Sequence, residues 1–568
     1  MNRRQAVNAA LVLFGLLLFG WRLGGHDLWP PDEPRFGLVA REMLERGDPV
    51  VLSRNGRLYT DKPPLFFWAI DAGAMLLRGG QVDEAAARLP SLLGSVLALL
   101  LVARLGTRLY DRTTGVLGAI LFATSMQILE RARWASIDMT LNFFVLAAIV
   151  LFWEEVERAR HPEVEGARAP AGSGARGGRW RAVVAWGAMG LATLAKGPVG
   201  LVMPLLAIVP ALVLLRRAQN LRRLVPIAGI ALYLLVVAGW FVPFSLRLGF
   251  GEAVHIATHQ TVERYVNAWN AQHPVWYYAW RFPAGFMPWS FFLPAALIAA
   301  FGRRRQGEGQ DGAPDRAERT AAIFLTAWMA AILIFFSFST GKRGVYVIPI
   351  YPAAALLVAR LFTRDAHRVL ATRSARVFAL FAFIIAAALP VAVPRKHPEF
   401  RTAALAVGAL LLAAGAVALW GASRRLLAVP WGIAAAMSVL MLVACEIVLP
   451  LADRHMNLSG FAAEVTAARD PAVPLGATEE KREVWVFYLR TTVEELDTPE
   501  QILHWIGEGP DRDLLIEEEL YRDIAPRLPP DVRILHTGRV SGRPYHLLAR
   551  RISGAQTDGA PPAGNEPR

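Results

Sequence analysis

The feature that most constrains the fold of this chain is a series of long apolar stretches, which recur from the N-terminus to about residue 450. A hydrocarbon core of ~30 Å needs roughly 20 apolar residues in a helix to cross it. The stretches therefore predict a polytopic α-helical membrane protein with about 13 transmembrane helices. They lie near Val7–Phe19, Leu89–Leu105, Gly115–Ile128, Met139–Phe152, Ala182–Leu194, Val199–Leu215, Leu224–Leu246, Phe282–Phe301, Ala321–Phe338, Val345–Leu361, Val377–Val393, Ala403–Trp420 and Leu426–Leu449.

The distribution of charge agrees with this class. The formal net charge of +14 would suit nucleic-acid binding, but the arginines cluster in loops between the apolar stretches, on alternate sides. By the positive-inside rule these loops are cytoplasmic, and so is the N-terminus, whose first apolar stretch we interpret as a retained span. We expect a plasma (inner) membrane protein with a periplasmic or otherwise extracytoplasmic C-terminus and no nucleic-acid partner. The single cysteine, Cys445, excludes an intrachain disulfide.

The composition turns polar after residue 450, which indicates a second domain. We expect a transmembrane domain at 1–450, a small extracytoplasmic α/β domain at 451–552, and a disordered tail at 553–568. The pieces expected to be strands are Val484–Leu489, Val532–Leu535 and Tyr545–Leu548, and the helix-like pieces lie around Glu464 and from Glu517 to Asp523.

Two charged motifs stand in the first loop on the outer side. The acidic pair Asp32-Glu33 lies between prolines, which restrict the backbone, so a rigidly placed carboxylate could serve as a general base. Further on, Asp61-Lys62 begins a segment rich in aromatic residues, where a lysine can hold a phosphate as a point charge. Each motif alone also fits a plainer interpretation, which is a solvated turn for the acids and a lysine that extends to the membrane surface.

Together the motifs resemble the signature of the GT-C membrane glycosyltransferases related to protein O-mannosyltransferases. They look closest to the branch that includes the aminoarabinose transferase acting on lipid A. The matching landmarks run in order from Asp32 to about Pro352, so the resemblance is specific for the family but does not identify the substrate. The landmarks are Asp32-Glu33-Pro34-Arg35-Phe36, Tyr59-Thr60-Asp61-Lys62-Pro63-Pro64-Leu65, Arg88-Leu89-Pro90, Arg133 to Asp138, Ala195-Lys196-Gly197-Pro198, Arg264-Tyr265, His273-Pro274, Trp276-Tyr277-Tyr278, Pro288-Trp289-Ser290, Lys342, Tyr346 and Pro349.

The resemblance implies roles for individual residues. Asp32 matches the catalytic carboxylate of the first outer loop, and Asp138 matches a second catalytic acid at the outer end of a span. The groups expected to surround the carrier phosphate are Lys62, Arg264, Lys342 and Tyr346, with Arg35, Tyr59 and Lys196 as supports.

A divalent metal is an open alternative, and no cofactor is required by this chemistry. The aminoarabinose branch has a glutamate before the lysine of the second motif, whereas this chain has Asp61, which keeps the charge but shortens the reach by a methylene. His255 and His259 have the i, i+4 spacing of one helix face, and His259 is the candidate second ligand. Two histidines without a well-placed third ligand are more often ordinary hydrogen-bonding residues.

The expected reaction moves a sugar from a polyprenyl (undecaprenyl) phosphate carrier to an extracytoplasmic lipid or protein acceptor, such as lipid A. Cations would stabilise the departing phosphate, a carboxylate would serve the acceptor, and direct attack predicts inversion at C1. Transfer to a protein or to another glycan is the alternative within this class. A lipid-linked sugar transporter or flippase, or an assembly subunit, also suits many spans, but the candidate residues gather at one face and no half-repeat is visible.

Overall fold

The computed structural model describes residues 3–158, 179–258, 271–302, 312–478, 481–507 and 511–551. Three sequence predictions lie outside these residues, namely the phosphate ligand Arg264, the metal ligand His259 and the disordered tail at 553–568. The chain forms two compact units. The first comprises Met1–His26 and Val39–Leu451, and the second comprises Asp27–Leu38 and the chain from Ala452 onward.

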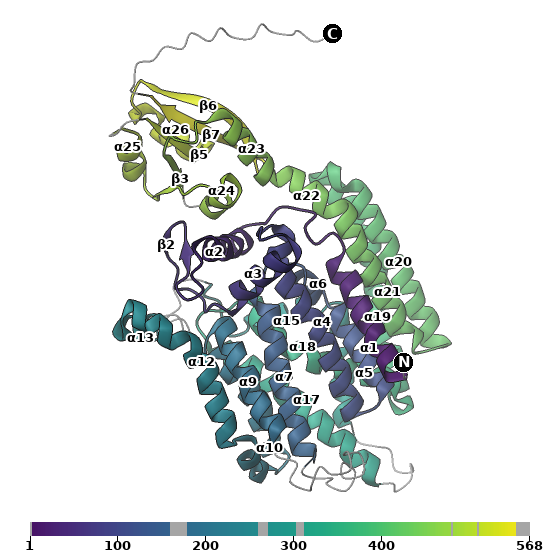
Figure 1. Cartoon of the computed structure of the whole chain (residues 1–568). Helices are drawn as coiled ribbons and strands as arrows, with labels where there is room; N and C mark the ends of the chain where they lie inside the picture. The colour runs from purple at the N-terminus through teal and green to yellow at the C-terminus, as the bar shows by residue number, and fades with distance from the viewer. Residues whose placement is uncertain are drawn as a thin grey trace. The chain divides into compact units, whose positions relative to one another are not determined.

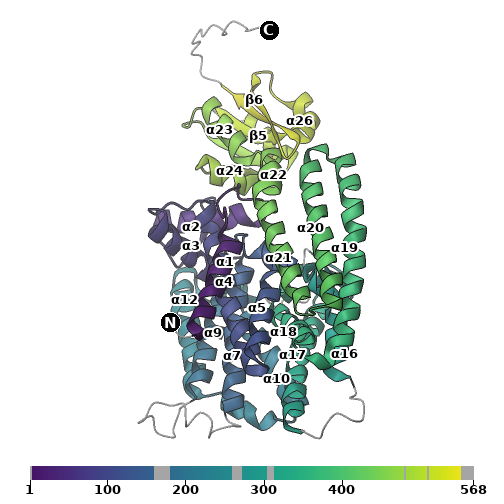
Figure 2. The same ribbon diagram turned by 90° about the vertical axis from the view of Figure 1, so that its right-hand side faces the viewer.

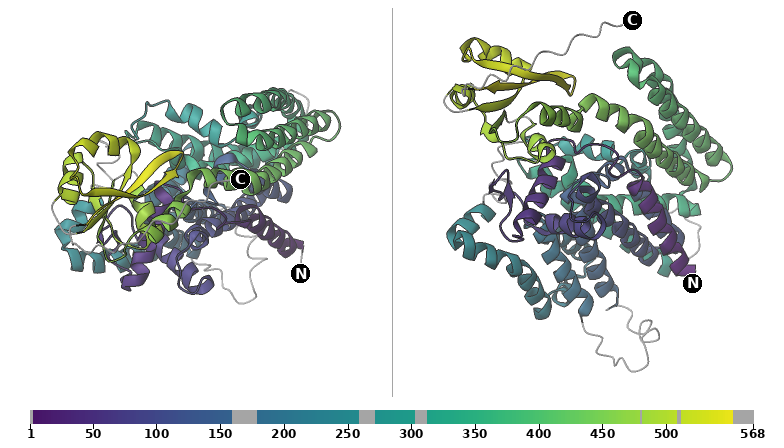
Figure 3. Two further views of the ribbon diagram at one scale, coloured as in Figure 1. Left: turned by 90° about the horizontal axis from the view of Figure 1, so that it is seen from above. Right: turned by 45° about the horizontal axis from the view of Figure 1, so that its top comes forward.

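The first unit is a bundle of helices that lie side by side (Figures 1 and 2). Helices α19, α20 and α21 lie together at one edge of the bundle, where α20 contacts both of the others (Figures 1 to 3). The helices of this unit are α1 (Arg3–Gly20), α3 (Leu65–Leu77), α4 (Glu84–Leu109), α5 (Arg112–Ala123), α6 (Met126–Arg131), α7 (Ile137–Arg158), α9 (Trp180–Lys196), α10 (Val199–Leu214), α11 (Leu221–Leu224), α12 (Ile227–Leu248), α13 (Phe250–Thr258), α15 (Tyr277–Gly285), α16 (Leu293–Phe301), α17 (Gly312–Phe338), the 3₁₀ helix η4 (Gly344–Ile350), α18 (Tyr351–Thr363), α19 (Arg368–Lys396), α20 (Arg401–Ser423) and α21 (Ala428–Val443).

Three elements complete the course of the first loop. Helix α2 (Asp32–Arg46) begins in the second unit and ends in the first. The short strands β1 (Ser53–Arg54) and β2 (Arg57–Leu58) then pair antiparallel and lead to the second motif.

The number of spans differs from the sequence prediction. Among the described residues, nine helices are long and apolar enough to cross a membrane, or ten if the bent pair Tyr277–Gly285 and Trp289–Phe301 counts as one span. The polytopic helical fold is therefore confirmed, but the count of about 13 is not. Three of the apolar stretches form helices that are shorter than the candidate spans. These helices, α5, α9 and α10, have 12, 17 and 16 residues. At ~1.5 Å per residue, α5 reaches only about 18 Å, which is less than the thickness of the hydrocarbon core.

Glycines let α4 lie close to α5 and α7. A Cβ atom on Gly115 of α5 would lie 2.4 Å from the carbonyl oxygen of Ala103 in α4. A Cβ atom on Gly94 of α4 would lie 2.9 Å from the carbonyl oxygen of Met139 in α7. Because both distances are too short for any side chain, these contacts require glycine, as in other close helix pairs of membranes. The contact with α4 fixes the start of α7, where Asp138 lies.

The second unit contains a five-stranded sheet in the order β4-β3-β5-β7-β6. Strand β3 pairs in parallel with β4 and β5, whereas β7 pairs antiparallel with β5 and β6. The mixed sheet with its helices confirms a small C-terminal α/β domain. Its elements are α22 (Leu449–Met456), which crosses the boundary of the units, α23 (Leu458–Ala468), β3 (Leu475–Thr478), α24 (Arg482–Leu489), β4 (Glu494–Leu496), α25 (Pro499–Gly507), β5 (Arg512–Glu517), α26 (Glu518–Ile524), β6 (Val532–Val540) and β7 (Arg543–Arg550).

One expected strand of this domain is a helix. The strands predicted at Val532–Leu535 and Tyr545–Leu548 fall in β6 and β7, but Val484–Leu489 belongs to α24. The residues Val484 to Phe487 of this helix are all buried. A short, continuously apolar run does not distinguish a buried helix from a buried strand by its periodicity, so the β-branched and aromatic residues were misleading.

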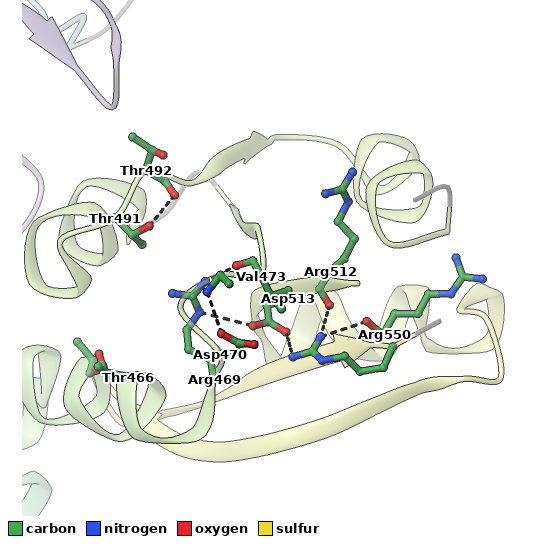
Figure 4. Close-up of polar contacts among 12 residues, drawn as sticks. Thr466, Arg469, Asp470, Val473, Thr491, Thr492, Arg512, Asp513 and Arg550 are labelled. Atoms are coloured by element: carbon green, nitrogen blue, oxygen red, sulfur yellow. Dashed lines mark hydrogen bonds and ion pairs between the residues drawn. The ribbon is translucent and has the colours of Figure 1, made fainter. Parts of the chain in front are cut away.

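A buried ion pair ties the first residues of β5 to the elements beside them (Figure 4). Asp513 is fully buried, and its carboxylate oxygens lie 2.7 Å from Nη2 of Arg551 and 3.5 Å from Nε of Arg469. Burial raises the pKa of Asp513, and the two arginines act in the opposite direction. Because Arg469 ends α23 and Arg551 follows β7, one carboxylate joins three elements of the domain.

Candidate active site

The helical bundle brings Asp138, Lys196 and Tyr346 together, although they lie far apart in the sequence. Asp138 and Lys196 form an ion pair through Oδ1 and Nζ, and their side chains are 13% and 17% exposed. The Lys196 ammonium lies 5.0 Å from the centre of the Tyr346 ring. Charges attract more strongly where water is partly excluded, and the face of an aromatic ring adds a favourable contact for a cation. A carboxylate, an ammonium and a phenol thus share one small site.

Two helix ends position this ion pair. Asp138 lies in the first turn of α7, and Lys196 is the last residue of α9. Negative charge is favoured near a helix N-terminus and positive charge near a C-terminus, so both residues complement the dipoles of their helices. Helix α9 ends at this point because Gly197 has a φ of 85°, which glycine adopts without strain. The hydroxyl of Ser136 donates to Oδ2 of Asp138 at 2.8 Å and fixes the second carboxylate oxygen.

Lys342 lies in the turn before η4 and is only 3% exposed. Its Nζ donates to the carbonyl oxygen of His273 at 2.8 Å and to that of Ser339. Burial lowers the pKa of the Lys342 ammonium. Two of the three N–H donors of this ammonium are therefore directed at the backbone. Through these two hydrogen bonds Lys342 stabilises the turn that leads to Tyr346. To bind the ammonium, a phosphate would have to replace one of the two carbonyl groups.

The second motif lies directly before α3, which contacts α4 and α9. Asp61 and Lys62 are both partly exposed, and Nζ of Lys62 donates to the carbonyl oxygen of Asp61 at 2.9 Å. Tyr59 is only 5% exposed, and its ring meets that of Phe67 edge to face at 5.9 Å between centroids. Tyr59 therefore anchors this loop, while Lys62 keeps part of its surface available to a ligand.

The two acids of the first motif have different surroundings. Asp32 forms an ion pair with Arg35 on the same helix, and these side chains are 27% and 22% exposed. Glu33 is fully buried, and its Oε2 accepts a hydrogen bond from the backbone N–H of Trp29 at 3.0 Å. Asp32 can thus meet a substrate, whereas Glu33 holds the turn before α2. Asp32 and Arg35 belong to the second unit, and the other described candidates belong to the first.

The metal site predicted at Asp61 and His259 stays a prediction, because His259 lies outside the described residues. In the part of the chain that the structure describes, no three His, Cys, Asp or Glu side chains are grouped as metal ligands. Of the two predicted ligands, Asp61 is in contact with the Lys62 ammonium through its carbonyl oxygen, and His259 lies outside that part.

Two polar residues in the first unit were not found from the sequence. Ser136 holds Asp138, and a hydroxyl two residues before an acid at a helix start was a usable signal. Asp71 lies on the buried face of α3 and is 5% exposed, and its Oδ1 has no hydrogen-bond partner among the described residues. Burial raises the pKa of Asp71 to about 7. An acid within the apolar stretch Leu65–Leu77 was the signal for this second residue.

Comparison with known sequences finds relatives of one kind. Residues 61–242 match the family model described as dolichyl-phosphate-mannose-protein mannosyltransferase. A protein of Erwinia tasmaniensis, named undecaprenyl phosphate-alpha-4-amino-4-deoxy-L-arabinose arabinosyl transferase, is 28% identical over 424 residues, which are 72% of this chain and 70% of that protein. A protein of Pseudomonas aeruginosa with the same name is 29% identical over 368 residues, which are 63% of this chain and 60% of that protein.

Comparison with solved structures identifies the fold. The crystal structure of ArnT from Cupriavidus metallidurans bound to undecaprenyl phosphate matches with a TM-score of 0.75 and 22% identity, covering 96% of this chain and 99% of that chain. The apo structure of the same protein matches with a TM-score of 0.77 and 21% identity, covering 96% and 98%. In its motifs, its sequence relatives and its fold, the chain is similar to the GT-C membrane glycosyltransferases of the protein O-mannosyltransferase-like superfamily, and within them to the aminoarabinose transferases.

Proposed function

We propose that this protein transfers a sugar from an undecaprenyl phosphate carrier to an extracytoplasmic lipid acceptor such as lipid A, with inversion at C1. The observation that carries the proposal is the Asp138–Lys196 ion pair beside Tyr346, a charged site set at helix ends of a membrane bundle. The shared fold with ArnT supports it, and so do the relatives, whose names include undecaprenyl phosphate and an aminoarabinose.

The proposed roles follow from charge and exposure. As the phosphate leaves, C1 acquires oxocarbenium-like character and negative charge collects on the leaving oxygen. We assign the reception of that charge to Lys62, which is partly exposed, together with Arg264 and with Lys342 after it gives up a carbonyl partner. We assign Lys196 and Tyr346, which lie together, to the same phosphate, with Asp138 holding the lysine in place. Fixed donors of this kind are worth about 10²–10³-fold in rate each.

The task of Asp32 depends on the acceptor. A hydroxyl acceptor must lose a proton, so the partly exposed Asp32 carboxylate would act as its base. A phosphomonoester acceptor has a second pKa of about 6 and is already mostly ionised at neutral pH. In that case Arg35, paired with Asp32, would offset the repulsion between the carboxylate and the phosphate. A protein or glycan acceptor would use the hydroxyl route.

We propose that the N-terminus is cytoplasmic and that the C-terminal domain lies on the periplasmic side of the inner membrane, where such an acceptor is found. The alternation of arginine-rich loops supports this orientation. Labelling of single cysteines, introduced into the C-terminal domain of a Cys445→Ser variant, with a membrane-impermeant reagent on whole cells tests it. Labelling only after the inner membrane is broken would reverse the proposed orientation.

The activity is tested with purified protein in detergent micelles, a carrier-linked sugar and a lipid A acceptor. A flippase or transporter has no second leaflet to serve in a micelle, so product formation there requires a transferase. Asp32→Asn is expected to lower kcat by at least about 10²-fold while carrier binding survives. The matched control is Glu45→Gln, which removes an exposed carboxylate from the same helix and should leave kcat unchanged. Full activity of Asp32→Asn would remove this residue from the mechanism.

Two further measurements refine the reaction. Nuclear magnetic resonance of the product reports whether the configuration at C1 is inverted, and retention would contradict direct attack by the acceptor. Addition of a chelator tests metal dependence, which Asp61 and His259 raised as an alternative. We expect transfer to continue without a divalent ion, and loss of activity that is restored by one metal would require a ligand set that includes His259.

A further inference from the structure

The segment Asp27–Leu38 consists of the end of the first loop's turn and the first residues of α2. It belongs to the same compact unit as the C-terminal domain. The segment carries Asp32 at its centre, and the domain follows more than 400 residues later in the chain. Three residues of the domain contact this segment, two through their side chains and one through its backbone N–H. We call Asp453, Ser459 and Tyr488 the clamp.

Each clamp residue comes from a different helix and meets the segment Asp27–Trp29. Oδ1 of Asp453 in α22 accepts from the backbone N–H of Asp27 and from Nε1 of Trp29, both at 3.0 Å. The hydroxyl of Tyr488 in α24 accepts from the backbone N–H of Leu28 at 2.7 Å. In α23, the backbone N–H of Ser459 donates to Oδ2 of Asp27 at 2.8 Å.

The contact is tight as well as polar. Leu28 is fully buried. A Cβ atom on Gly37 would lie 2.9 Å from Cδ1 of Leu28 and 3.0 Å from Cε2 of Phe487, so the first turns of α2 lie against α24 with no room for a side chain. Without the clamp, the buried N–H groups of Asp27 and Leu28 would each lose a hydrogen bond, which is unfavourable for a buried donor.

The clamp is connected to Asp32 through one further bond. Trp29, whose indole is held by Asp453, donates its backbone N–H to Oε2 of the buried Glu33. Glu33 is the neighbour of Asp32 in the first turn of α2. A shift of Trp29 would therefore move the start of the helix that presents Asp32. Displacement of a reacting group by about 1 Å can cost about 10²-fold in rate.

We propose that the C-terminal domain is a positioning element for transfer, and that its clamp sets the place of Asp32. The proposal rests on the proposed function, because positioning has meaning only if Asp32 acts on the acceptor. Asp453, Ser459 and Tyr488 are positioning residues, since they touch the loop that carries the acid and act through it. The domain then needs no catalytic residues of its own.

The test uses the full-length protein in the micelle assay, with Asp453→Ala and Tyr488→Phe. Tyr488→Phe removes only the oxygen that accepts from Leu28 and should fold normally. We expect kcat to fall about 10-fold for Tyr488→Phe and about 10²-fold for Asp453→Ala, with KM for the carrier-linked sugar unchanged. The conservative variant Asp453→Asn keeps an oxygen at Oδ1, so it should recover much of the lost kcat. Tyr521→Phe and Asp470→Asn, in the same domain but outside the clamp, are the matched controls.

A double-mutant cycle separates positioning from a general loss of structure. Trp29→Phe removes the indole N–H that Asp453 binds, so the losses in kcat of Trp29→Phe and Asp453→Ala should be less than additive. Additive losses, an unchanged kcat for both clamp variants, or equal losses in the controls would overturn the proposal. Failure of the proposed function would look different, because wild-type protein would then form no product and Asp32→Asn would change nothing.

Discussion

The two acids expected to take part in transfer are held in different ways. Asp138 is enclosed by partners from the bundle, because Lys196 and Ser136 bind its two oxygens. Asp32 pairs with Arg35 one turn along its own helix and keeps more of its side chain exposed. An acid with both oxygens bound, one of them by a cation, sets the position of a lysine, whereas an acid that is more exposed can meet an acceptor. We therefore expect the first unit to act as a structural frame and the acceptor chemistry to belong to the second.

Among the variants that test this contrast between Asp138 and Asp32, we expect the largest effect from Lys196→Met, which removes the cation beside Asp138. Removing one partner of a mostly buried pair costs roughly 3–5 kcal/mol, so the melting temperature in detergent should fall clearly. We expect kcat to fall about 10²–10³-fold, because a donor near the phosphate is lost. Adding Asp138→Asn should restore the melting temperature but not the activity. Lys396→Met, an exposed lysine at the end of α19, is the control. An active Lys196→Met variant would exclude a frame built on this pair.

The next effect concerns Glu33, the buried neighbour of Asp32. Glu33→Gln keeps an oxygen that can accept from Trp29, so kcat should stay within a few-fold of the wild-type value. Glu33→Ala leaves that N–H unpaired, which costs roughly 1–3 kcal/mol, and kcat should fall about 10-fold. Steady-state kinetics of both variants beside Asp32→Asn make the measurement. If Glu33→Gln were as inactive as Asp32→Asn, the negative charge of Glu33 would be needed and the division of the acidic pair would be wrong.

The class of fold could be predicted from the sequence because apolar length is a local property. The number of spans could not, since α5 and α10 are mainly apolar yet stop after 12 and 16 residues. Where such a helix ends depends on its neighbours, as in the contact of Gly115 with α4. The same limit explains Val484–Leu489, whose residues fit a buried strand and a buried helix equally well.

The candidate residues could be named from motifs, but their partners could not. The motifs single out Asp138 and Lys196 separately, and only the packing of α7 on α9 shows that they neutralise each other. Lys342 was expected at a phosphate, and its two backbone carbonyl partners depend on chain distant from its own motif. The contacts of the clamp with Asp27–Trp29 could not be predicted either, because the clamp residues belong to a domain in which no motif was recognised.

A smaller effect is expected from Asp71, the buried acid of α3, whose Oδ1 has no hydrogen-bond partner among the described residues, whereas Asp138 pairs with Lys196. Burial raises its pKa from 3.8 to about 7, so its contribution to stability is full below pH 3.8 and is lost as the pH rises to about 7. Asp71→Asn removes this loss, and the melting temperature should rise by a few degrees at pH 8 but not at pH 4. Thermal unfolding at both values measures the difference. A decrease at pH 8 would mean that the ionised carboxylate has a partner and resembles Asp138 after all.

The smallest effect is expected from Asp48, which offers an exposed counterpart to the Asp138–Lys196 pair. Oδ1 of Asp48 accepts from Arg247 at 2.7 Å and from the backbone N–H groups of Val50 and Val51, and the Arg247 side chain is 51% exposed. Burial would raise the pKa of Asp48, but these hydrogen bonds and Arg247 lower it. Its stabilising contribution is therefore present above pH 3.8 and is lost as the pH falls through the lowered pKa.

Because water and salt screen an exposed pair, Arg247→Ala should cost no more than about 1 kcal/mol at pH 7, and 0.5 M salt (~4 Å Debye length) should reduce that cost. The same salt should leave the cost of Lys196→Met almost unchanged, because the Asp138–Lys196 pair is largely shielded from solvent. Melting temperatures of both variants at low and high salt give the comparison directly. Equal salt sensitivity would mean that the Asp138–Lys196 pair is as open to water as the Asp48–Arg247 pair. The exposure of the side chains would then no longer distinguish Asp138 from Asp32.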